Sequence, residues 1–600
     1  MTNISSHNWR SIFTITVLSA YFYALTEWLF FVTKPSSLSI LTLFEKLKVL
    51  FVTGGIIALP LVMIFVVLSI PALFNPKWKV LTLFPAAFAL SITVLILFDN
   101  FTYTVFKFGV ISSGGIFRAV YALGFLLVFW RMTHVSRVLL QRDWKTASRL
   151  TFGLLALSTI LILTTYLSAN PNTVRNSSDV SRNRPNILIL GGDGLSARYM
   201  SAYGYELETT PFLTELAKTS LVAENAFNNA SSTTGSTTSL LTGKYPVHIN
   251  VIRYPDILSG NDSFEHLPGI LKRQGYQTVQ IGTPYYVDAQ RLNLLDGFDI
   301  VNNQSLNLPA LNTLRALLGN SPSMYFIQTI IERSAVRLLH IFFVGEMKNP
   351  LVEVNNPKSR MTDEERTQQI IELLDQADRP LFIFAHFMDT HGPEFSSEQH
   401  VYYSGSSDEA EDWDMDLYKD ALLSYDAHIR EIYDYLATSG KLDNTIIVIY
   451  TDHGYRYTIN QRIPIIIHFP HNTPSGVREH NVQVMDIPVT LLDYLDITQP
   501  EWVSGMSILD DEPPPDREIV SVTSGSPKKI APPFNQIKTV QVIVCHKWYL
   551  LNVQENTWKS GMVSNHTSKC DDKELPSDEQ VRQRILDYLE EQGYYTSSLQ

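Results

Sequence analysis

The sequence contains very little cysteine and no excess of basic residues. Only Cys545 and Cys570 occur among 600 residues, both near the C-terminus. A cysteine-based zinc site and a disulfide framework are therefore excluded, and the two thiols either form one disulfide or stay unpaired. The 47 basic residues are outnumbered by 59 acidic ones, giving a formal charge of −12. The chain thus lacks the basic surface that nucleic-acid binding requires, and nucleic acid is not an expected partner.

Long apolar runs are concentrated in the first quarter of the chain. A bilayer-spanning helix needs about 20 predominantly apolar residues. Because several runs reach this length and a polar remainder follows, we expect a membrane domain and a separate globular domain. Five transmembrane helices are predicted, at Ser11–Thr33, Val49–Phe74, Val80–Phe98, Gly109–Trp130 and Leu150–Leu167.

Basic residues in the short loops predict the orientation of these helices, because cytoplasmic loops retain Lys and Arg. Lys77 and Lys79 lie between the second and third runs. With an odd number of spans, the chain after Leu167 is delivered to the opposite side. We therefore expect a multi-pass protein of the cell membrane, plasma or inner, with its globular part outside the cytoplasm. The loop between the fourth and fifth runs agrees, since it contains Arg131, Arg137, Arg142, Lys145 and Arg149.

One acidic residue, Glu27, lies inside the first apolar run. Ionisable residues within membrane spans are often functional. The alternative is a carboxylate near the membrane interface beside Trp28. The sequence leaves both interpretations open.

The globular part begins after a polar segment, 169–184, that is typical of a solvated linker. Apolar runs at Asn186–Gly192, Pro380–Phe387 and Asn444–Thr451 have the length of buried parallel strands. Helix-like segments between them favour an α/β sandwich.

Potential ligands stand at or near the carboxyl ends of all three predicted strands. Asp193 follows the first, His386 lies within the second, and Asp452 and His453 follow the third. In sheets of this kind, catalytic and ligand-binding residues are usually found at this edge. A single acidic residue there is often only a turn former, but three such strand ends together indicate a site.

Ordered motifs around these residues resemble the sulfatases and the wider alkaline phosphatase superfamily. The resemblance covers Pro185 to Ile497 and is carried by the order of the motifs, because each one alone is weak. It begins with PNILILGGDGLSARYMSAYGYELETTPFLTELA and continues through STTGSTTSLLTGKYP, with an LTGxYP landmark at Leu241–Pro246. It goes on with LKRQGYQTVQIG, HFMDTHGP, TIIVIYTDHG, RIPIIIHFP and MDIPVTLLDYLDI.

Five preceding membrane spans make the architecture similar to that of phosphoethanolamine transferases and lipoteichoic-acid synthases. This resemblance implies an N-terminal helical membrane domain (1–168), a linker (169–184), a sulfatase-like catalytic domain (185–510) and a small C-terminal subdomain (511–600). It also implies an enzyme that acts on phosphate-containing lipids with an unmodified threonine.

Counting back from the LTGxYP landmark places Thr233 at the position of the family's covalent nucleophile. Asp193, Asp452 and His453 would form the metal site together with Thr233. Two carboxylates and one imidazole suit zinc or manganese, and less well calcium or magnesium. A divalent metal is expected because it makes a threonine hydroxyl nucleophilic at neutral pH. The alternative for Thr233 is a polar loop or helix cap, since Ser and Thr surround it.

Further residues are assigned to the substrate side of the site. The resemblance places His391 there, where it would bind phosphoryl oxygens or protonate the leaving group, and His386 is a second candidate. For His386 the alternative is a core histidine at a strand end, and for His391 a loop histidine. Ser236 would help to hold the transferred group.

Two departures argue against sulfate ester hydrolysis. Sulfatases convert a cysteine or serine of a CxPxR-like motif to formylglycine, but this chain has Thr233, Gly235 and Thr237 at the corresponding places. Thr283 stands where the family has a sulfate-binding lysine. The leading hypothesis is therefore a transferase or hydrolase for a phospho-headgroup, phosphoethanolamine-like, of a membrane lipid or surface glycan. The alternatives are a true sulfatase and a non-catalytic membrane sensor with the same fold.

Two segments outside the motifs also give expectations. Met324–Val344 is an amphipathic helix that either lies at the lipid surface or packs in the core of the globular domain, and we favour the core. The segment from Thr539 predicts paired strands followed by a helix at Asp578–Gln592.

Overall fold

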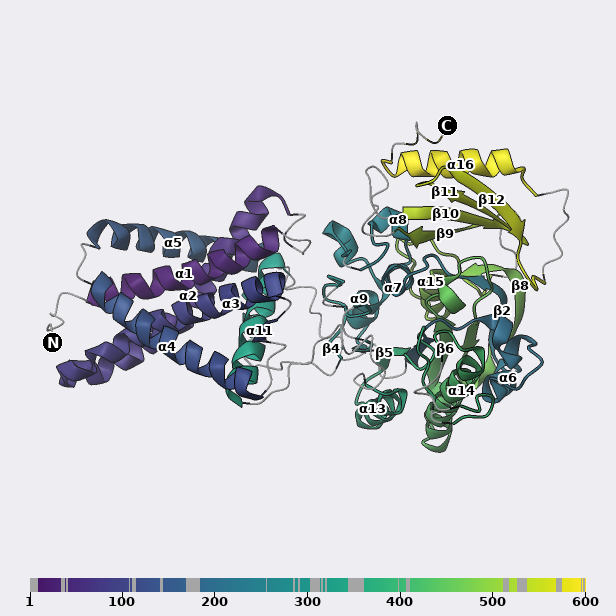
Figure 1. Ribbon diagram of the computed structural model, residues 1–600, viewed down its shortest axis with the longest axis horizontal. Coiled ribbons are helices and arrows are strands. Elements are labelled where there is room, and N and C mark those ends of the chain that lie inside the picture. Colours follow the sequence, from purple (N-terminus) through teal and green to yellow (C-terminus); the bar gives the residue numbers. More distant parts are fainter. Residues whose placement is uncertain are drawn as a thin grey trace. The chain divides into compact units, whose positions relative to one another are not determined.

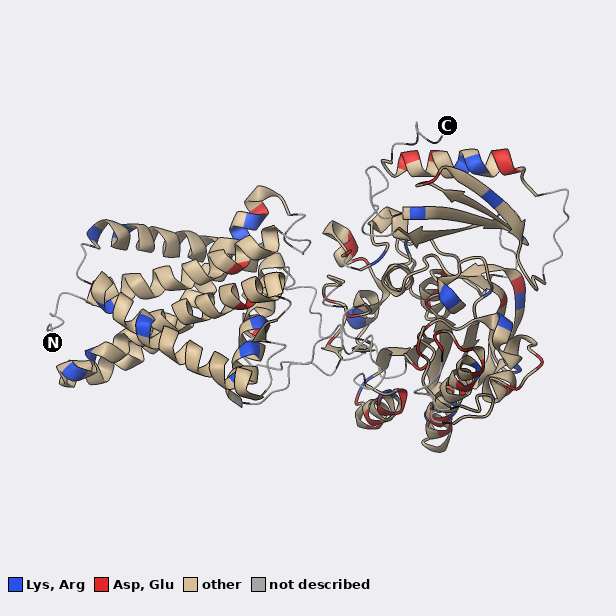
Figure 2. Cartoon of the chain, viewed as in Figure 1, with Lys and Arg blue, Asp and Glu red and all other residues tan. Residues whose placement is uncertain are grey.

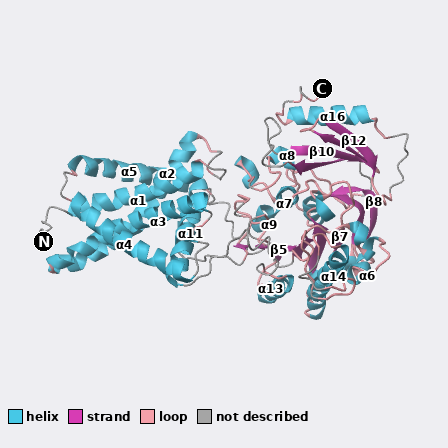
Figure 3. Cartoon of the chain, viewed as in Figure 1, coloured by secondary structure: helices cyan, strands magenta, loops and turns pink. Residues whose placement is uncertain are grey.

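A computed structural model of the chain describes residues 9–599 except 169–183, 303–312, 344–360, 511–516, 526–536, 568–574 and several gaps of five residues or fewer. The chain forms two compact units. One comprises Met1–Arg175 and Leu306–Asn349, and the other Asn176–Ser305 and Pro350–Gln600. In the described parts the first unit is helical and the second mixes helices and strands (Figures 1 and 3).

Five helices of the first unit are long and apolar enough to cross a membrane. They expose large apolar side chains; on α2, for example, Leu59, Met63 and Val67 are 60–62% exposed. Such a surface suits lipid and not water. The five predicted spans are thus confirmed as helices: α1 (Trp9–Val32), α2 (Leu43–Phe74), α3 (Phe84–Phe106), α4 (Gly115–Leu139) and α5 (Lys145–Ser168).

The helix ends differ from the predicted bounds mainly around α3 and α4. α3 extends to Phe106 and α4 to Leu139, so Arg131 and Arg137 lie in the last turns of α4 and not in a loop. Apolar runs mark only the part of a helix that meets hydrocarbon, whereas backbone hydrogen bonding continues beyond it.

A further long helix of this unit, α11 (Pro322–Phe343), comes from the middle of the chain. Its Met324 and Ile327 are buried in one cluster with Val52 and Ile56 of α2. The expectation that this helix packs in the core of the globular domain is therefore wrong.

The second unit is built around an eight-stranded sheet of order β4-β3-β5-β1-β6-β7-β2-β8. β1 is central and pairs in parallel with β5 and β6, while β7 is antiparallel to both its neighbours. The strands are β1 (Asn186–Gly192), β2 (Leu221–Phe227), β3 (Gln277–Ile281), β4 (Ile300–Val301), β5 (Leu381–Phe387), β6 (Thr445–Thr451), β7 (Ile465–His468) and β8 (Gly476–Gln483).

Side chains of β1 alternate between two hydrophobic cores. Ile187 and Ile189 belong to one core, and Leu188 and Leu190 to the other. Because both faces of the sheet are covered, the strand is apolar at every position, as the sequence indicated. The α/β sandwich is thereby confirmed. In the described residues its α-helices are α6 (Pro211–Ala217), α7 (Thr233–Thr242), α8 (Pro246–Ile249), α9 (Leu267–Arg273), α13 (Asp363–Gln376), α14 (Met415–Thr438) and α15 (Asp486–Tyr494).

A small antiparallel sheet, of order β12-β11-β10-β9, forms the C-terminal part together with α16. The predicted paired strands and final helix are both present. The elements are β9 (Glu518–Ser524), β10 (Ile537–Val544), β11 (Lys547–Asn552), β12 (Thr557–Met562) and α16 (Asp578–Glu591). Cys545, between β10 and β11, is disulfide-bonded, and Cys570 lies outside the described residues.

Candidate active site

Three potential metal ligands meet at the carboxyl ends of β1 and β6. The two strands are parallel neighbours, with Gly192 opposite Thr451. Asp193 directly follows β1, and Asp452 and His453 directly follow β6. One ligand atom from each of the three buried residues lies within 4.8 Å of the others.

The donor set fits a divalent cation. Oδ1 of Asp193 and Oδ2 of Asp452 are buried and accept no hydrogen bond. Nε2 of His453 lies 3.6 Å from the first oxygen and 3.4 Å from the second. The other ring nitrogen, Nδ1, lies 3.2 Å from the carbonyl of Gly454. Donation to that carbonyl leaves Nε2 as the metal-binding atom, and a cation offsets the cost of two buried carboxylates.

Thr233 stands at the same place as the first residue of α7. Its Oγ1 lies 3.4 Å from Asp193 Oδ2 and 3.5 Å from His453 Nε2. Ser232 caps the helix by accepting a hydrogen bond from the N–H of Gly235. The hydroxyl of Thr233 is therefore held beside the potential metal ligands, at the end of a helix that favours negative charge.

His386, on β5, donates from the other side of Asp193. Its Nε2 lies 3.1 Å from Asp193 Oδ2, and the ring is fully buried. Burial alone lowers the pKa of His386, but the hydrogen bond to Asp193 and the charges of Asp452 and Asp193 raise it overall. Burial likewise raises the pKa of Asp193, whereas the charges of His391 and His453 and the His386 hydrogen bond lower it overall. Asp193 is thus held as a carboxylate.

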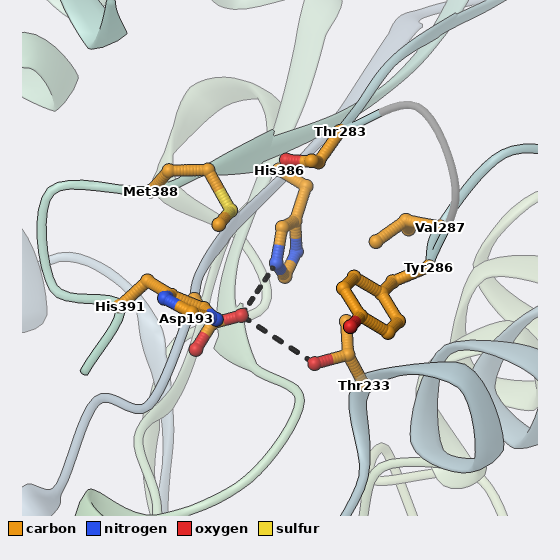
Figure 4. Close-up of a pocket in the computed structure, with 8 residues that line it drawn as sticks. All are labelled: Asp193, Thr233, Thr283, Tyr286, Val287, His386, Met388 and His391. Carbon is orange, nitrogen blue, oxygen red and sulfur yellow. Dashed lines mark hydrogen bonds and ion pairs between the residues drawn. The ribbon is translucent and has the colours of Figure 1, made fainter. Parts of the chain in front are cut away.

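A small pocket opens onto these groups (Figure 4). The carboxylate of Asp193, the hydroxyl of Thr233 and the ring of His386 point toward one another, and His391 lies on the opposite wall from Thr233. Its lining residues are Asp193, Thr233, Thr283, Tyr286, Val287, His386, Met388 and His391. Among these described residues there is no Lys or Arg. The lining includes every predicted substrate-side residue except Ser236, which is buried in α7 and whose role stays a prediction.

Several residues of the site were not predicted from the sequence. Tyr286, Val287 and Met388 line the pocket, and the ring of Tyr457 lies 4.6 Å from that of His453. The backbone at Tyr457 is left-handed, with φ at 60°. The residue types at this position do not predict such a turn, because tyrosine rarely adopts a left-handed conformation. Burial, followed by the charges of Asp193 and Asp452, raises the pKa of Tyr457.

The family model that matches this chain is that of the sulfatases, over residues 185–497. The chain belongs to the sulfatase family. All the strand ends described above fall within the matched range. The family assignment makes the chain a hydrolase of the sulfatase type. Members of this family are generally dependent on divalent metals, and this chain has a buried Asp/Asp/His cluster that could hold such an ion.

Curated relatives are distant. An N-acetylglucosamine-6-O-sulfatase of Bacteroides thetaiotaomicron is 24% identical over 397 residues, which are 54% of this chain and 70% of that protein. An arylsulfatase of Hemicentrotus pulcherrimus is 22% identical over 350 residues, covering 53% of this chain and 59% of the relative.

Similar solved structures cover about two thirds of this chain. A phosphonate monoester hydrolase of Agrobacterium radiobacter has a TM-score of 0.49 at 15% identity, covering 68% of this chain and 96% of that one. An alkaline phosphatase superfamily protein from Vibrio parahaemolyticus has a TM-score of 0.44 at 17% identity, covering 70% of this chain and 92% of that one.

Proposed function

We propose that the protein transfers or hydrolyses a phospho-headgroup, phosphoethanolamine-like, of a membrane lipid or surface glycan through Thr233. The observation that carries the proposal is the position of the Thr233 hydroxyl, 3.4 Å from Asp193 and 3.5 Å from His453. A threonine that served only as a helix cap has no need of metal ligands around its hydroxyl.

In the first step Oγ1 of Thr233 attacks the phosphorus of a phosphodiester. A hydrogen bond to Oδ2 of Asp193, which His386 also contacts, orients the hydroxyl, and its proton passes to water as the bond to phosphorus forms. The bond from phosphorus to the leaving alcohol breaks as His391 protonates the alcohol oxygen. The products are a phosphothreonine diester and a free alcohol.

In the second step water or an acceptor alcohol attacks the same phosphorus. The bond to Oγ1 breaks, the threonine oxygen takes up a proton from water, and His391 removes the proton of the attacking group. Asp193, Asp452 and His453 would hold a divalent cation, zinc or manganese from the nature of these ligands, and when bound it would stabilise negative charge on the threonine oxygen and attract the anionic substrate. Calcium or magnesium suits the donor set less well.

The pocket chemistry supports a singly charged phosphodiester as substrate. Its described lining residues provide two histidines and no Lys or Arg, so beyond the proposed cation little positive side-chain charge is available for a doubly charged phosphate. Thr283 contributes a hydroxyl where a lysine would contribute a charge. A phosphodiester needs less compensating positive charge in the pocket, because it carries a single negative charge.

A sulfuric ester hydrolase is the second candidate. It is favoured by the relatives, which are named as sulfatases. It is disfavoured by Thr233, since a threonine cannot become the formylglycine that sulfatases use. Sulfated and phosphorylated substrates therefore need to be tested side by side.

The location proposed for this chemistry is the extracytoplasmic side of a cell membrane. Five long apolar helices associate the chain with a membrane. The disulfide at Cys545 supports an oxidising compartment for the second unit. Substrates within reach of such a unit are lipid headgroups and surface glycans.

Trapping of the intermediate tests the proposal. The purified full-length protein is incubated with phosphatidylethanolamine vesicles, quenched in acid, digested and analysed by mass spectrometry. We expect a phosphoethanolamine adduct on Thr233 in the wild-type protein, and no adduct in Thr233→Ala. Release of sulfate from an aryl sulfate with Thr233 intact and unmodified, and without phosphodiester cleavage, would favour the sulfatase instead.

Metal analysis separates the enzyme from a non-catalytic sensor. We expect about one zinc or manganese per chain in the wild type, and loss of that metal in Asp452→Asn. The matched control is Asp443→Asn, an exposed carboxylate just before β6. Absence of bound divalent metal from active, folded protein contradicts the proposed site.

A further inference from the structure

Helix α11 interrupts the second unit in sequence but packs in the helical unit. It lies between β4 and α13 along the chain, whereas Leu306–Asn349 clusters with the first 175 residues. The ring of Phe326 contacts that of Phe31 on α1 edge-on at 5.6 Å. Figure 1 shows α11 lying across α1–α4 at one end of this unit.

The two arginines of α11 face the helix bundle. Nε of Arg337 lies 2.7 Å from Asp99 Oδ2 on α3. Nε of Arg333 lies 3.4 Å from Glu27 Oε2 on α1, and the Glu27 side chain is fully buried. Between them, the hydroxyl of Tyr23 lies 2.7 Å from that of Ser334. Basic and acidic positions gather at this end of the unit (Figure 2). Glu27 is therefore a buried ion-pair partner and not a carboxylate exposed at the interface.

The opposite face of α11 is apolar in its second half. Val336, Leu339 and Phe342 are 37%, 44% and 37% exposed. A helix on the surface of a soluble domain has the reverse pattern, with charges outward and apolar residues inward. Charged residues that turn inward and pair, beneath an apolar outer face, are typical of helices in lipid.

The contacts of α11 lie well inside the ends of the membrane helices. Tyr23 and Glu27 precede the end of α1 at Val32 by nine and five residues. Asp99 precedes the end of α3 at Phe106 by seven residues. At 1.5 Å per residue, these contacts are about 8–14 Å below the helix ends. Because the 24 residues of α1 span about 36 Å and the hydrocarbon layer about 30 Å, the contacts of α11 with Tyr23 and Glu27 lie inside the hydrocarbon layer. Asp99, which directly follows the apolar run that ends at Phe98, marks the edge of that layer.

The apolar face of α11 continues the apolar surface of α4. The ring of Phe342 contacts that of Phe125 edge-on at 5.6 Å. Near Phe125, α4 exposes Val120 and Leu123, at 59% and 61%. The same bilayer that covers α4 therefore extends over α11.

We propose that α11 is a sixth membrane element, embedded beside the five spanning helices. The ion pairs Glu27–Arg333 and Asp99–Arg337 hold it, and Val336, Leu339 and Phe342 contact the acyl chains of the same bilayer. The proposal is independent of the reaction proposed above, because its test measures position and not activity.

Spin labelling in lipid nanodiscs tests the contact with lipid. A nitroxide is attached to Leu339→Cys in the full chain, and to Lys559→Cys on the exposed strand β12 as a water-facing control. We expect the label at 339 to collide more with oxygen than with a water-soluble nickel chelate, and the label at 559 to show the reverse. Collision of the 339 label with the chelate at the rate of the 559 label overturns the proposal. So does dipolar broadening between 339 labels on two chains, which would mean that a second copy covers the helix.

Removal of the ion pairs tests how α11 is held. In Arg333→Gln and Arg337→Gln, separately and together, we expect the nickel-to-oxygen collision ratio at 339 to rise toward that of the 559 label. Arg430→Gln, which breaks an exposed pair with Asp434, is the matched control and leaves the ratio unchanged. An unchanged ratio in the double variant overturns the role of the ion pairs.

Discussion

At the scale of single residues, His391 has the clearest chemical test. It lies in the pocket across from Thr233, and its charge is among those that lower the pKa of Asp193. A proton donor matters most when the leaving alcohol is a poor one. We expect His391→Gln to slow cleavage of an alkyl phosphodiester by about 10²–10⁴-fold and that of a nitrophenyl phosphodiester much less.

The comparison of the two substrates separates this role from general damage to the site. His400→Gln, at an exposed histidine of the same connecting segment, is the control and keeps both rates. Equal slowing of both substrates by His391→Gln would mean that His391 does not protonate the leaving group.

A second histidine, His266, makes stability depend on pH. It is fully buried, its Nδ1 accepts from the N–H of Gly269, and burial lowers its pKa from 6.5 to about 4. Between these values the unfolded chain binds the proton and the folded chain does not. The free energy of unfolding therefore falls as pH drops from 6.5 to 4, by up to about 3 kcal/mol.

Chemical denaturation of the full-length protein at several pH values measures this effect. We expect the decrease in the free energy of unfolding to be smaller in His266→Gln by the contribution of His266, because glutamine does not titrate. In His400→Gln we expect the same decrease as in the wild type. The same pH dependence in His266→Gln and wild type would assign the effect to other groups.

At the scale of elements, α7 is held in place by the absence of a side chain at Gly235. A Cβ there would lie 2.5 Å from the carbonyl oxygen of Ile252 and 2.9 Å from Cβ of Ala230. Backbone cannot yield as a flexible side chain can, so Gly235→Ala must displace the helix that begins with Thr233. We expect kcat to fall by about 10²-fold with the metal retained, as measured on a phosphodiester. Gly124→Ala, where nothing lies within 4 Å, is the control, and full activity of Gly235→Ala would contradict the tight packing.

The first turn of α13 positions the loop that carries His391. The buried carboxylate of Asp363 accepts hydrogen bonds from the N–H groups of Met388, at 2.8 Å, and Asp389, at 2.7 Å. The N–H of His391 in turn donates to the carbonyl of Met388 at 3.0 Å. An asparagine keeps only one acceptor oxygen, and its NH2 would face the donors Arg366 Nη1 and Met388 N–H, which both donate to the second carboxylate oxygen.

We expect Asp363→Asn to lower kcat by about 10²-fold through displacement of this loop, and to reduce the difference in rate between alkyl and nitrophenyl substrates in the same sense as His391→Gln. Glu364→Gln, at the exposed neighbouring position, should leave kcat on both substrates unchanged. Retention of wild-type selectivity between the two substrates by Asp363→Asn would assign Asp363 a purely structural role.

At the scale of the whole molecule, the basic loops predict which side of the membrane holds the second unit. Lys77 and Lys79 precede α3, and Arg137, Arg142, Lys145 and Arg149 lie in and around the short connection between α4 and α5. In sealed vesicles with the cytoplasmic face inward, we expect added trypsin to cut within the linker 169–184, while the second unit stays attached to the membrane through α11. In inverted vesicles it should be protected until detergent is added. Cleavage only in inverted vesicles would reverse the orientation.

The sequence by itself determined the elements whose physics is local. Five apolar runs of membrane-spanning length are five helices, and apolar runs buried on both faces are the central strands β1, β5 and β6. It also named Asp193, Asp452 and His453, because ligands at the ends of adjacent parallel strands must lie close together. These features depend only on hydrophobic length, burial and strand periodicity.

Only the tertiary structure decided what depends on distant contacts. The amphipathic pattern of α11 permits a lipid surface or a domain core, and the choice came from acidic partners at Glu27 and Asp99, more than 200 residues away along the chain. Likewise, the left-handed turn that sets Tyr457 against His453 and the pocket walls at Tyr286, Val287 and Met388 have no local signal. Their positions follow from packing between segments, which periodicity and residue type do not encode.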